Sequence, residues 1–289
     1  MIDSRMAAVM NFVRAGSRVA DIGADHGYLS VELIKSGRAS SVIATEKNFE
    51  PFKILRKNIF DSGFENFIDV RLGDGLKIFS AGEVDTICIA GMGGALIAKI
   101  LDDAPEVVHA ARQLILQPMN AAKKIRAWLA ENDWTIADED LAESAGIIYE
   151  MICAEKNSPE KIFKRESSPL LKKFLTQRLE KLQRVLSEMS KSESARTSEK
   201  FFATLAQVEA LRKKMKTVAL KEKIAGLYSH VLFEYEGRDC GVDPIAENKF
   251  IMWFGVETIT LGNIEEVMQL KFFDGKSLSE IADEIEIYE

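Results

Sequence analysis

The sequence lacks the features that mark secreted, metal-binding and membrane-spanning proteins. Its 289 residues include only three cysteines, Cys88, Cys153 and Cys240, which are too widely spaced for a disulfide framework or a cysteine-based zinc site. No apolar run approaches the roughly 20 residues that a membrane-spanning helix needs. The first 16 residues predict a short amphipathic helix and contain no signal-peptide core. We therefore expect a cytoplasmic protein with reduced cysteines, no metal and no membrane partner.

Positive charge is scarce over the chain as a whole, yet it is concentrated in one segment. The net charge is −7, but residues 156–224 contain 18 Lys and Arg against 8 Asp and Glu. The flanking segments are acidic. Residues 1–155 contain 16 Lys and Arg against 23 Asp and Glu, and residues 225–289 contain 4 Lys and Arg against 14 Asp and Glu. A basic segment between two acidic ones indicates a partner of negative charge for the middle of the chain.

Apolar runs bounded by Gly, Asp or Ser recur through the first 155 residues and predict seven strands. The runs are RVADIG (18–23), SVIATE (41–46), FIDVRLGD (67–74), VDTICIAG (84–91), RQLILQP (112–118), WTIADEDL (134–141) and IIYEMICAE (147–155). Segments with helical spacing separate the first five, which favours βαβ units and a parallel sheet covered on both faces. Only Glu143–Gly146 separate the last two, so they form a hairpin. This layout is typical of the Rossmann-like class I methyltransferase fold, an α/β fold with a seven-stranded sheet.

The segment 156–165 is polar and contains Pro159, so we place a domain boundary there and assign residues 1–158 to the methyltransferase domain. Beyond it, apolar residues from Leu175 to Met189 follow an a/d heptad spacing, and a second apolar stripe runs from Phe201 to Val218. We predict a basic, antiparallel coiled-coil hairpin over residues 159–225.

The acidic residues 226–289 are predicted to form a small helical accessory module of unknown role. Residues 270–285 resemble the opening of the helix-turn-helix of sigma-like regulators, in which Ser277 would cap a helix running through Ile281 and Ile285. The strong negative charge of this segment opposes nucleic-acid contact, so we expect no DNA partner.

The turn after the first predicted strand has the composition of a cofactor-binding loop. Its glycines let the backbone approach a ligand, and the following helix points its N-terminus at it. The residues concerned are Asp21, Gly23, Asp25, His26, Gly27 and Tyr28. Glu46 ends the second strand, where a carboxylate can accept the ribose hydroxyls of an adenosine. These features fit NAD and S-adenosylmethionine equally well.

Three further features favour S-adenosylmethionine. Asp21 and Asp25 would repel a pyrophosphate but attract an ammonium or a sulfonium group. The spacing of Gly23 and Gly27 departs from the G-x-G-x-x-G of pyrophosphate recognition. Asp74, between Gly73 and Gly75, follows the third strand, where it can accept the adenine amino group.

Glycine-rich and amide-containing turns also follow the fourth and fifth strands. Gly91 and Met92 are predicted to face the cofactor, and Gly93, Gln117 and Asn120 the methyl acceptor. A glycine-rich loop there leaves room for a planar acceptor. The alternative, a turn that only packs a helix, explains Gly93 and Gly94 equally well.

On these residues the sequence resembles the bacterial tRNA (adenine-22-N1)-methyltransferases. The shared strings are DIGADHGYL (21–29), an acidic residue at 46, GDGL (73–76), AGMGG (90–94) and LILQP (114–118). Together and in this order they are specific, whereas each alone is not. The resemblance covers roughly residues 1–225 and implies methyl transfer to N1 of an adenine in the tRNA D-arm. Ser30 and Met119 depart from the family pattern, in which we expect proline and asparagine.

Adenine N1 is itself a nucleophile, so positioning supplies much of the rate, and a nearby carboxylate can stabilise the positive charge left on the base. Asp25 and Glu150 are the candidates for this carboxylate. His26 is a candidate base or RNA contact, with helix capping as its structural alternative. Tyr28 and Met92 could pack on the target base; the alternative is that both side chains pack in the core.

The basic segment is predicted to contact tRNA phosphates, the alternative being a solvated helix face. The residues are Lys161, Lys164, Arg165, Lys172, Lys173, Arg178, Arg184, Arg212, Lys213, Lys214 and Lys216. Two other hypotheses stay open: methylation of another RNA, a protein or a small molecule, and RNA binding without catalysis. We expect a monomer.

Overall fold

The computed structural model describes residues 3–156, 167–226 and 230–288. The chain divides into two compact units, Met1–Leu171 and Lys172–Glu289, which are described separately below. We expected three segments. Instead, the predicted hairpin and the C-terminal segment share the second unit.

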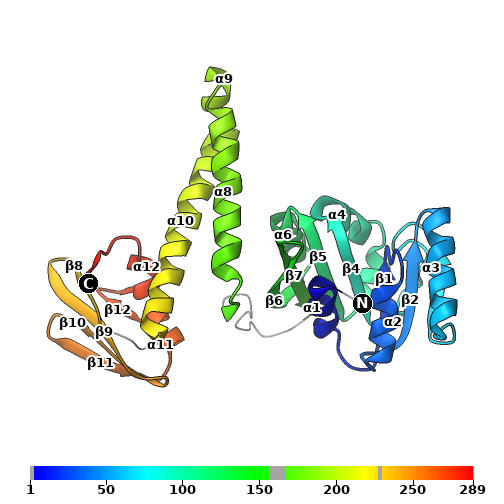
Figure 1. Ribbon diagram of the computed structural model, residues 1–289, viewed down its shortest axis with the longest axis horizontal. Coiled ribbons are helices and arrows are strands. Elements are labelled where there is room, and N and C mark those ends of the chain that lie inside the picture. Colours follow the sequence, from blue (N-terminus) through cyan, green and yellow to red (C-terminus); the bar gives the residue numbers. More distant parts are fainter. Residues whose placement is uncertain (1–2, 157–166, 227–229, 289) are drawn as a thin grey trace. The chain divides into compact units, whose positions relative to one another are not determined.

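The first unit contains a seven-stranded sheet in the order β3-β2-β1-β4-β5-β7-β6 (Figure 1). The strands are β1 (Ser17–Ile22), β2 (Ala39–Glu46), β3 (Ile68–Leu72), β4 (Thr86–Gly93), β5 (Gln113–Asn120), β6 (Thr135–Ser144) and β7 (Ile147–Glu155). β7 pairs antiparallel with β5 and β6, whereas the β1, β2, β3, β4 and β5 pairs are parallel. The seven predicted strands, their final hairpin and the class I methyltransferase layout are confirmed.

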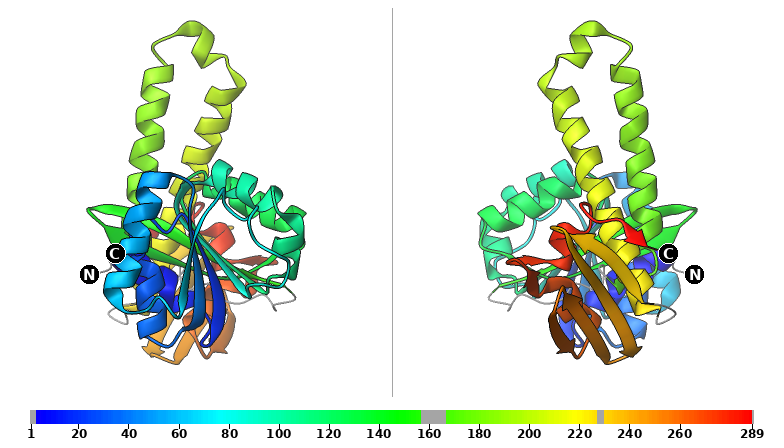
Figure 2. Two further views of the ribbon diagram at one scale, coloured as in Figure 1. Left: turned by 90° about the vertical axis from the view of Figure 1, so that its right-hand side faces the viewer. Right: turned by 90° about the vertical axis from the view of Figure 1, so that its left-hand side faces the viewer.

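Helices cover both faces of this sheet (Figure 2). One face carries α1 (Ser4–Phe12), α2 (Tyr28–Lys35) and α3 (Phe49–Ser62), and the other α4 (Gly94–Asp102), α5 (Pro105–Ala110) and α6 (Ala122–Glu131). Successive strand residues point to opposite faces, so Val19 and Ala20 of β1 lie in different cores. Burial on both faces explains why the strands are apolar along their length.

Two glycines allow helices to begin close to neighbouring elements at the carboxyl edge of the sheet. A Cβ at Gly94 would lie 2.7 Å from the carbonyl oxygen of Ala121, so only glycine lets α4 start there. Gly27 has a φ of +76°, and a Cβ on it would lie 2.8 Å from Leu55 Cδ1 of α3. The packing interpretation of the glycine-rich turn is therefore confirmed for Gly94.

In the second unit, two long helices run in opposite directions (Figures 1 and 2). They are α8 (Leu171–Met189) and α10 (Glu199–Ala225), with the short α9 (Glu193–Arg196) between them. Lys172 Nζ near the start of α8 lies 3.3 Å from Glu222 Oε2 near the end of α10. The two helices are as predicted, but a coiled coil is not confirmed: Leu205 of the expected stripe is 37% exposed, whereas Thr204 beside it is buried.

The prediction of a helical C-terminal module is wrong. Residues 230–288, here called the C-terminal module, contain a five-stranded antiparallel sheet in the order β11-β10-β9-β8-β14. Its strands are β8 (Val231–Tyr235), β9 (Arg238–Ala246), β10 (Lys249–Phe254), β11 (Glu257–Leu261) and β14 (Ile287–Tyr288). Buried and exposed residues alternate along β8, which is the two-residue period of a half-buried strand.

The expected helix-turn-helix is a short hairpin followed by one helical turn. β12 (Lys271–Phe273) and β13 (Lys276–Ser277) pair antiparallel, and Asp274 and Gly275 between them both have positive φ angles, as a tight hairpin turn requires. Ser277 caps α12 (Leu278–Ile281) as predicted, in a capping box with Glu280. The helix nevertheless ends at Ile281 and does not reach Ile285.

The core of the C-terminal module includes the end of α10. Leu220 and Ile224 are 3% and 0% exposed and pack with Val231, Phe233 and Phe273, beside α11 (Ile264–Gln269). The module thus rests on apolar surface that α10 provides.

Replacing Ile224 by Ala tests this shared core. Truncating a buried isoleucine costs about 2–5 kcal/mol of unfolding free energy. We therefore expect faster hydrogen exchange in peptides spanning β8, β9 and β10, measured by mass spectrometry on the full chain.

Leu205→Ala is the matched control, because Leu205 lies in the same helix and is 37% exposed. It should leave exchange in the module close to that of the wild-type protein. Unchanged protection of the module in Ile224→Ala would contradict the shared core.

Candidate active site

Several predicted cofactor residues line one cavity. The parallel strands β1–β5 all end at the same edge of the sheet, where open α/β sheets bind ligands. A cavity of about 260 Å³ opens there. It is lined by Asp3, Arg5, Met6, Asp21, Gly23, Ala24, Asp25, His26, Tyr28, Leu29 and Ala90. The structure therefore brings the β1–α2 loop, the end of β4 and the N-terminal helix together.

Asp21 is a buried carboxylate at this cavity. Its residue surface is 5% exposed, and Ser30 Oγ donates a hydrogen bond to Asp21 Oδ2 at 2.6 Å. Burial raises the pKa of Asp21 to about 6, and the hydrogen bonds from Ser30 partly oppose that rise. Ser30 thus provides the hydroxyl that stabilises the ionised form.

Gly23 lets the loop approach the end of β4. It has a φ of +71°, and a Cβ there would lie 2.3 Å from Met92 Cε. The backbone N–H groups of Gly23 and Ala24 donate to the carbonyl oxygen of Thr45 at 3.0 and 2.9 Å. Met92 is half-buried and packs against the core on the α4 side of the sheet.

Asp25, His26 and Tyr28 form the exposed rim of the cavity. Asp25 has a φ of +50°, and its side chain is 75% exposed. His26 Nε2 lies 3.7 Å from Asp25 Oδ1, and the His26 and Tyr28 ring centroids are 5.6 Å apart. The N-cap of α2 is Gly27, so the capping interpretation of His26 is wrong. The His26 side chain is 46% exposed and lines the cavity beside Asp25 and Tyr28.

The ends of β2 and β3 present one available and one ion-paired carboxylate. Glu46 Oε1 accepts from the backbone N–H groups of Lys47 (2.9 Å) and Asn48 (3.1 Å). Its Oε2 accepts no hydrogen bond from the described residues, which leaves it for a ribose hydroxyl. Asp74 lies 2.8 Å from Lys77 Nζ and 3.0 Å from Lys47 Nζ, and hydrogen bonds from these lysines lower its pKa to about 2.

The ends of β4 and β5 are fixed by a buried amide. Gln117 is 0% exposed, and its Oε1 accepts from the backbone N–H of Gly91 at 3.0 Å. Gln117 therefore holds the end of β4 instead of facing a substrate. Asn120 is exposed, and a Cβ at Gly93 would lie 3.3 Å from Asn120 Oδ1, so this amide and the open Gly93 backbone share one surface.

Arg5 of α1 is a site residue that sequence reasoning missed. Its Nη1 donates to Met119 Sδ at 3.5 Å, and its guanidinium lies 5.3 Å from the centre of the Tyr149 ring. Arg5 Nε is buried, lies 3.5 Å from Asp3 Oδ2 and has no hydrogen-bond partner among the described residues. A thioether is a weak acceptor, so Arg5 retains donors for an anionic or carbonyl group in the cavity.

The position of Arg5 depends on contacts that join the N-terminus to the β6–β7 hairpin. Asp3 caps α1 by accepting from the backbone N–H of Met6 at 2.9 Å, and it also accepts from Ser144 Oγ at 2.9 Å. The Asp3 cap could be read from the sequence. Nothing in the periodicity of this helix indicates which strand ends it approaches.

Glu150, the second predicted catalytic carboxylate, lies in a different cluster. Arg126 Nη2 donates to Glu150 Oε1 at 2.8 Å and also bonds Glu139. Because neighbours in a strand point to opposite faces, Glu150 points away from the face on which Tyr149 contacts Arg5. The structure thus gives Glu150 an ion-pair role and leaves Asp25 as the carboxylate on the cavity rim.

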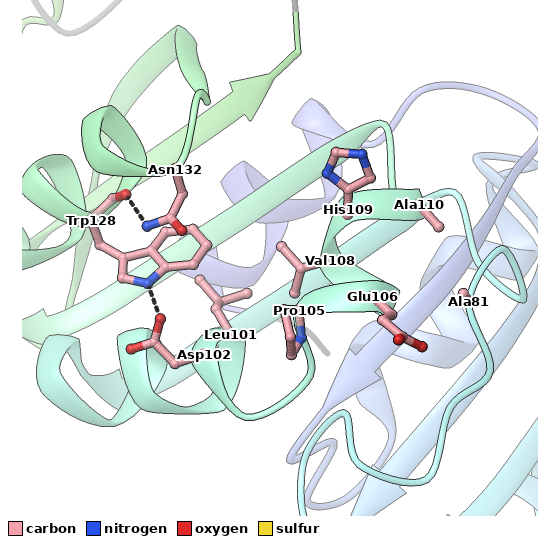
Figure 3. A pocket seen from close by; sticks show the side chains of 10 residues that line it. All are labelled: Ala81, Leu101, Asp102, Pro105, Glu106, Val108, His109, Ala110, Trp128 and Asn132. Atoms are coloured by element: carbon pink, nitrogen blue, oxygen red, sulfur yellow. Dashed lines mark hydrogen bonds between the residues drawn. The ribbon is translucent and has the colours of Figure 1, made fainter.

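A larger cavity, of about 640 Å³, lies beside α4, α5 and α6 (Figure 3). Trp128 Nε1 donates to Asp102 Oδ1 at 2.6 Å, and Asn132 Nδ2 donates to the Trp128 carbonyl oxygen at 2.8 Å. It shares no lining residue with the cavity at Asp21. We do not assign it to the site.

The predicted tRNA contacts divide into paired and unpaired residues. Lys213 Nζ lies 2.7 Å from Asp283 Oδ1, and Lys172 pairs with Glu222. Lys173, Arg178 and Lys214 also have partners. In contrast, Arg212 is exposed with no partner in the described chain. Lys161, Lys164 and Arg165 lie outside the described residues.

Positive charge in the helical pair is concentrated at one end. Residues 179–211, at the α9 end, contain five Lys and Arg and five Glu. Residues 167–178 contain three basic residues and no acidic one. Residues 212–224 contain six basic residues and one acidic residue. The start of α8 and the end of α10, which Lys172 and Glu222 join, therefore form the basic end of the pair.

The edge of the sheet fits S-adenosylmethionine. Asp21 and Asp25 present carboxylates for its ammonium and sulfonium groups, and Glu46 has one free oxygen for its ribose. Gly75 and Gly91 have φ angles of +61° and +76°, so their backbones can approach a ligand closely. Asp74 can accept an adenine amino group only alongside its two lysine partners.

Comparisons with known proteins point to the same chemistry. A family model described as a methyltransferase domain matches residues 2–152. A tRNA (adenine(22)-N(1))-methyltransferase of Bacillus subtilis (strain 168) is 32% identical over 230 residues, which cover 74% of this chain and 96% of the relative.

Two solved structures share the fold. The crystal structure of the B. subtilis M1A22 tRNA methyltransferase TrmK matches with a TM-score of 0.63 and 30% identity over 76% of this chain and 98% of that one. Streptococcus pneumoniae Sp1610 in complex with S-adenosyl-L-methionine matches with a TM-score of 0.65 and 32% identity over 74% of this chain and 100% of that one. About a quarter of this chain thus extends beyond these relatives. Within the described ranges, no helix has both the length and the apolar character that crossing a membrane requires.

Replacing Asp21 by Asn tests the burial of this carboxylate. Because its pKa in the folded protein is raised to about 6, the folded state binds the proton more tightly than the unfolded chain does. Stability from this group is therefore fully present below about pH 4 and is lost as pH rises through 6. The free energy of unfolding of Asp21→Asn minus that of the wild type should increase by about 2–3 kcal/mol between pH 4 and pH 7.

Urea unfolding at several pH values measures this difference. Asparagine keeps an acceptor for Ser30 but cannot ionise. Glu65→Gln, which removes an exposed carboxylate of the same unit, is the control. A difference between Asp21→Asn and wild type that does not vary with pH would show that Asp21 is not held in a desolvated site.

Proposed function

We propose, on the premise that the chain belongs to the family of bacterial tRNA (adenine(22)-N(1))-methyltransferases, that it transfers a methyl group from S-adenosyl-L-methionine to N1 of the adenine at position 22 in the D-arm of tRNA. The observation that carries this proposal is identity of 32% over 96% of the B. subtilis relative, combined with a carboxylate-lined cavity at the carboxyl edge of the sheet. Such an enzyme acts in the cytoplasm, where its substrate is found.

Each element of the edge has a role in this reaction. When bound, the cofactor supplies a methyl group that is already activated on a sulfonium. Asp21 holds its cationic end and Glu46 its ribose, which leaves Asp25 at the rim for the methyl acceptor. Gly23 and Gly91 keep the backbone clear of it.

Asp25 is the carboxylate that we propose to assist the transfer. N1 of adenine attacks with a lone pair and has no proton to lose, so a general base is not required for bond formation. As the N1–CH₃ bond forms and the S–CH₃ bond breaks, positive charge passes to the base. Asp25 would accept a hydrogen bond from the N6 amino group, which orients N1 and stabilises that charge.

The surroundings of Asp25 suit a base that has left its stack. The His26 and Tyr28 rings stand beside it, and both side chains are substantially exposed at the rim. Stacking and edge contacts of this kind hold a base once it is unstacked. Asn120 and Arg5 provide amide and guanidinium donors at the neighbouring strand ends.

Basic residues of α8 and α10 are the proposed binding surface for the tRNA backbone. The positive excess at the basic end of the helical pair suits phosphate contact, whereas the α9 end carries no net charge. Arg212 and Lys223 are exposed residues without partners in the described chain, and we propose that both contact phosphates. DNA is excluded from this proposal because an adenine of the tRNA D-arm is the target.

Replacing Asp25 by Asn should lower kcat by about 100-fold, because a neutral amide oxygen stabilises the developing charge less well. The measurement is methyl transfer from labelled S-adenosyl-L-methionine to unmodified tRNA at saturating cofactor, followed by nucleoside analysis. Glu65→Gln removes an exposed carboxylate from the same domain and should retain wild-type kcat. If Asp25→Asn raised only the KM for the cofactor, Asp25 would be a cofactor ligand and not a catalytic group. No label in tRNA with the wild-type protein would overturn the proposed function itself.

The basic-end proposal is tested by two double variants that remove equal charge. Arg212→Gln with Lys223→Gln should weaken tRNA binding and reduce the slope of log K against log salt by about 1.5. Arg196→Gln with Lys200→Gln, at the near-neutral α9 end, should change both quantities little. Equal effects of the two double variants would show that tRNA binding does not depend on where along the helices the positive charge lies.

A further inference from the structure

The C-terminal module occupies one side of the basic end of α10. Leu220 and Ile224 lie in the module core, so this side of the helix is fixed against the module. Two lysines flank this apolar contact. Lys213 Nζ lies 2.7 Å from Asp283 Oδ1, and Lys221 Nζ forms an ion pair with Glu265.

These pairs neutralise the lysines that border the contact. Lys213 also donates to the Glu280 carbonyl oxygen at 3.2 Å, and Lys216 to the Asp283 carbonyl oxygen at 3.2 Å. The hydrogen bond from Lys213 lowers the pKa of Asp283, which keeps that carboxylate ionised at neutral pH. The charges of Lys213 and Lys221 are thus already paired, whereas Lys216 contacts only a carbonyl oxygen.

Two further cations of α10 make no contact with the module among the described residues. Arg212 and Lys223 are eleven residues apart, about three helical turns, so their side chains share one side of the helix. Both are exposed, and neither has a partner among the described residues. Lys216, seven residues before Lys223, lies on the same side and contacts the Asp283 carbonyl oxygen. The helix therefore presents two ion-paired lysines at the module and, beside them, cations without an ion pair.

The charge of the module reinforces this division. Residues 225–289 contain 14 Asp and Glu against 4 Lys and Arg. A phosphate approaching Lys213 or Lys221 would meet Asp283 or Glu265 within about one Debye length, roughly 8 Å at physiological salt, where repulsion is only partly screened. Arg212 and Lys223 have no such acid paired with them in the described chain.

We propose that the C-terminal module is a specificity element that confines RNA to the Arg212 and Lys223 side of α10, with Asp283 and Glu265 as its determining residues. The inference rests on the proposed tRNA-binding role of the basic end. Repelling wrong binding modes is a recognised route to specificity, because discrimination depends on the difference between two affinities. The module would thus suppress binding of RNA in other orientations, at the cost of two phosphate contacts.

The first test removes the acids from the full-length protein. Asp283→Asn with Glu265→Gln is compared with Glu247→Gln with Glu257→Gln, which neutralises two exposed acids elsewhere in the module. Binding of tRNA and of an unrelated RNA duplex is measured at several salt concentrations.

The Asp283 and Glu265 variant should bind the unrelated duplex several-fold more tightly. Its slope of log K against log salt should steepen by about 1.5, because two lysines become available and each phosphate contact contributes about 0.7–0.9. The control pair should change the slope little. A steeper slope in both variants would reflect net charge alone and would overturn the proposal, as would no change in either.

The second test does not depend on releasing the module. Lys213→Gln with Lys221→Gln should leave tRNA affinity within about twofold of wild type, because these lysines are already paired, whereas Arg212→Gln with Lys223→Gln should reduce it strongly. Hydrogen exchange in β8–β10 confirms that the module stays folded in each variant.

The outcomes separate this inference from the proposed function. If removal of Lys213 and Lys221 weakened tRNA binding as much as removal of Arg212 and Lys223, the lysines would be RNA ligands and the inference would fail. If neither pair affected tRNA binding, the basic end would not be the RNA surface, and the inference would fail with it. Methylation of N1 by the wild-type protein would stand in both cases.

Discussion

The close approach of the β1–α2 loop to the end of β4 is the constraint on which the site depends. Gly23 has a φ of +71°, which favours glycine, and its backbone N–H donates to the Thr45 carbonyl oxygen, while the buried amide of Gln117 fixes the backbone at Gly91. Asp21, at the end of β1 just before this loop, is buried deeply enough for its pKa to rise to about 6. Tightly packed interiors cannot relax one residue at a time. The placement of the buried carboxylate Asp21 is therefore a product of core packing, whereas Asp25 lies at the exposed rim.

The first unit could be predicted from the sequence because burial on both faces leaves a simple signal. Strands covered by helices are apolar along their whole length, and glycines and carboxylates stand out where such strands end. The C-terminal module has the opposite character. Its sheet is half-buried, so the signal in Val231–Tyr235 is an alternation over only five residues. The helix cap at Ser277 was predicted correctly, but it led to a helical prediction for the whole segment. The hairpin turn at Asp274 and Gly275, just before the cap, was therefore missed.

Within the site, local motifs were predicted and distant partners were not. The β1–α2 loop is a continuous string, so Asp21, Gly23 and Asp25 could be assigned together. Arg5, however, donates a hydrogen bond to Met119, which lies 114 residues away in the sequence, so local patterns could not place it at the site. Lys213 differs from its unpaired neighbour Arg212 through Asp283 and Glu280, residues of a module whose fold the sequence did not predict. Residue type and charge identify candidates, but which donors remain free is decided by tertiary contacts.

The uninterrupted α10 has a mechanical consequence. Its 27 residues span about 40 Å, and its last turns are embedded in the core of the C-terminal module. A straight helix resists bending, so it acts as a lever between the α9 turn and the module. α10 is continuous from Glu199 to Ala225, so a rotation at its α9 end is transmitted to its module end. A partner that binds and rotates the module would therefore rotate α10 as well, and a displacement of α10 would move the module with it.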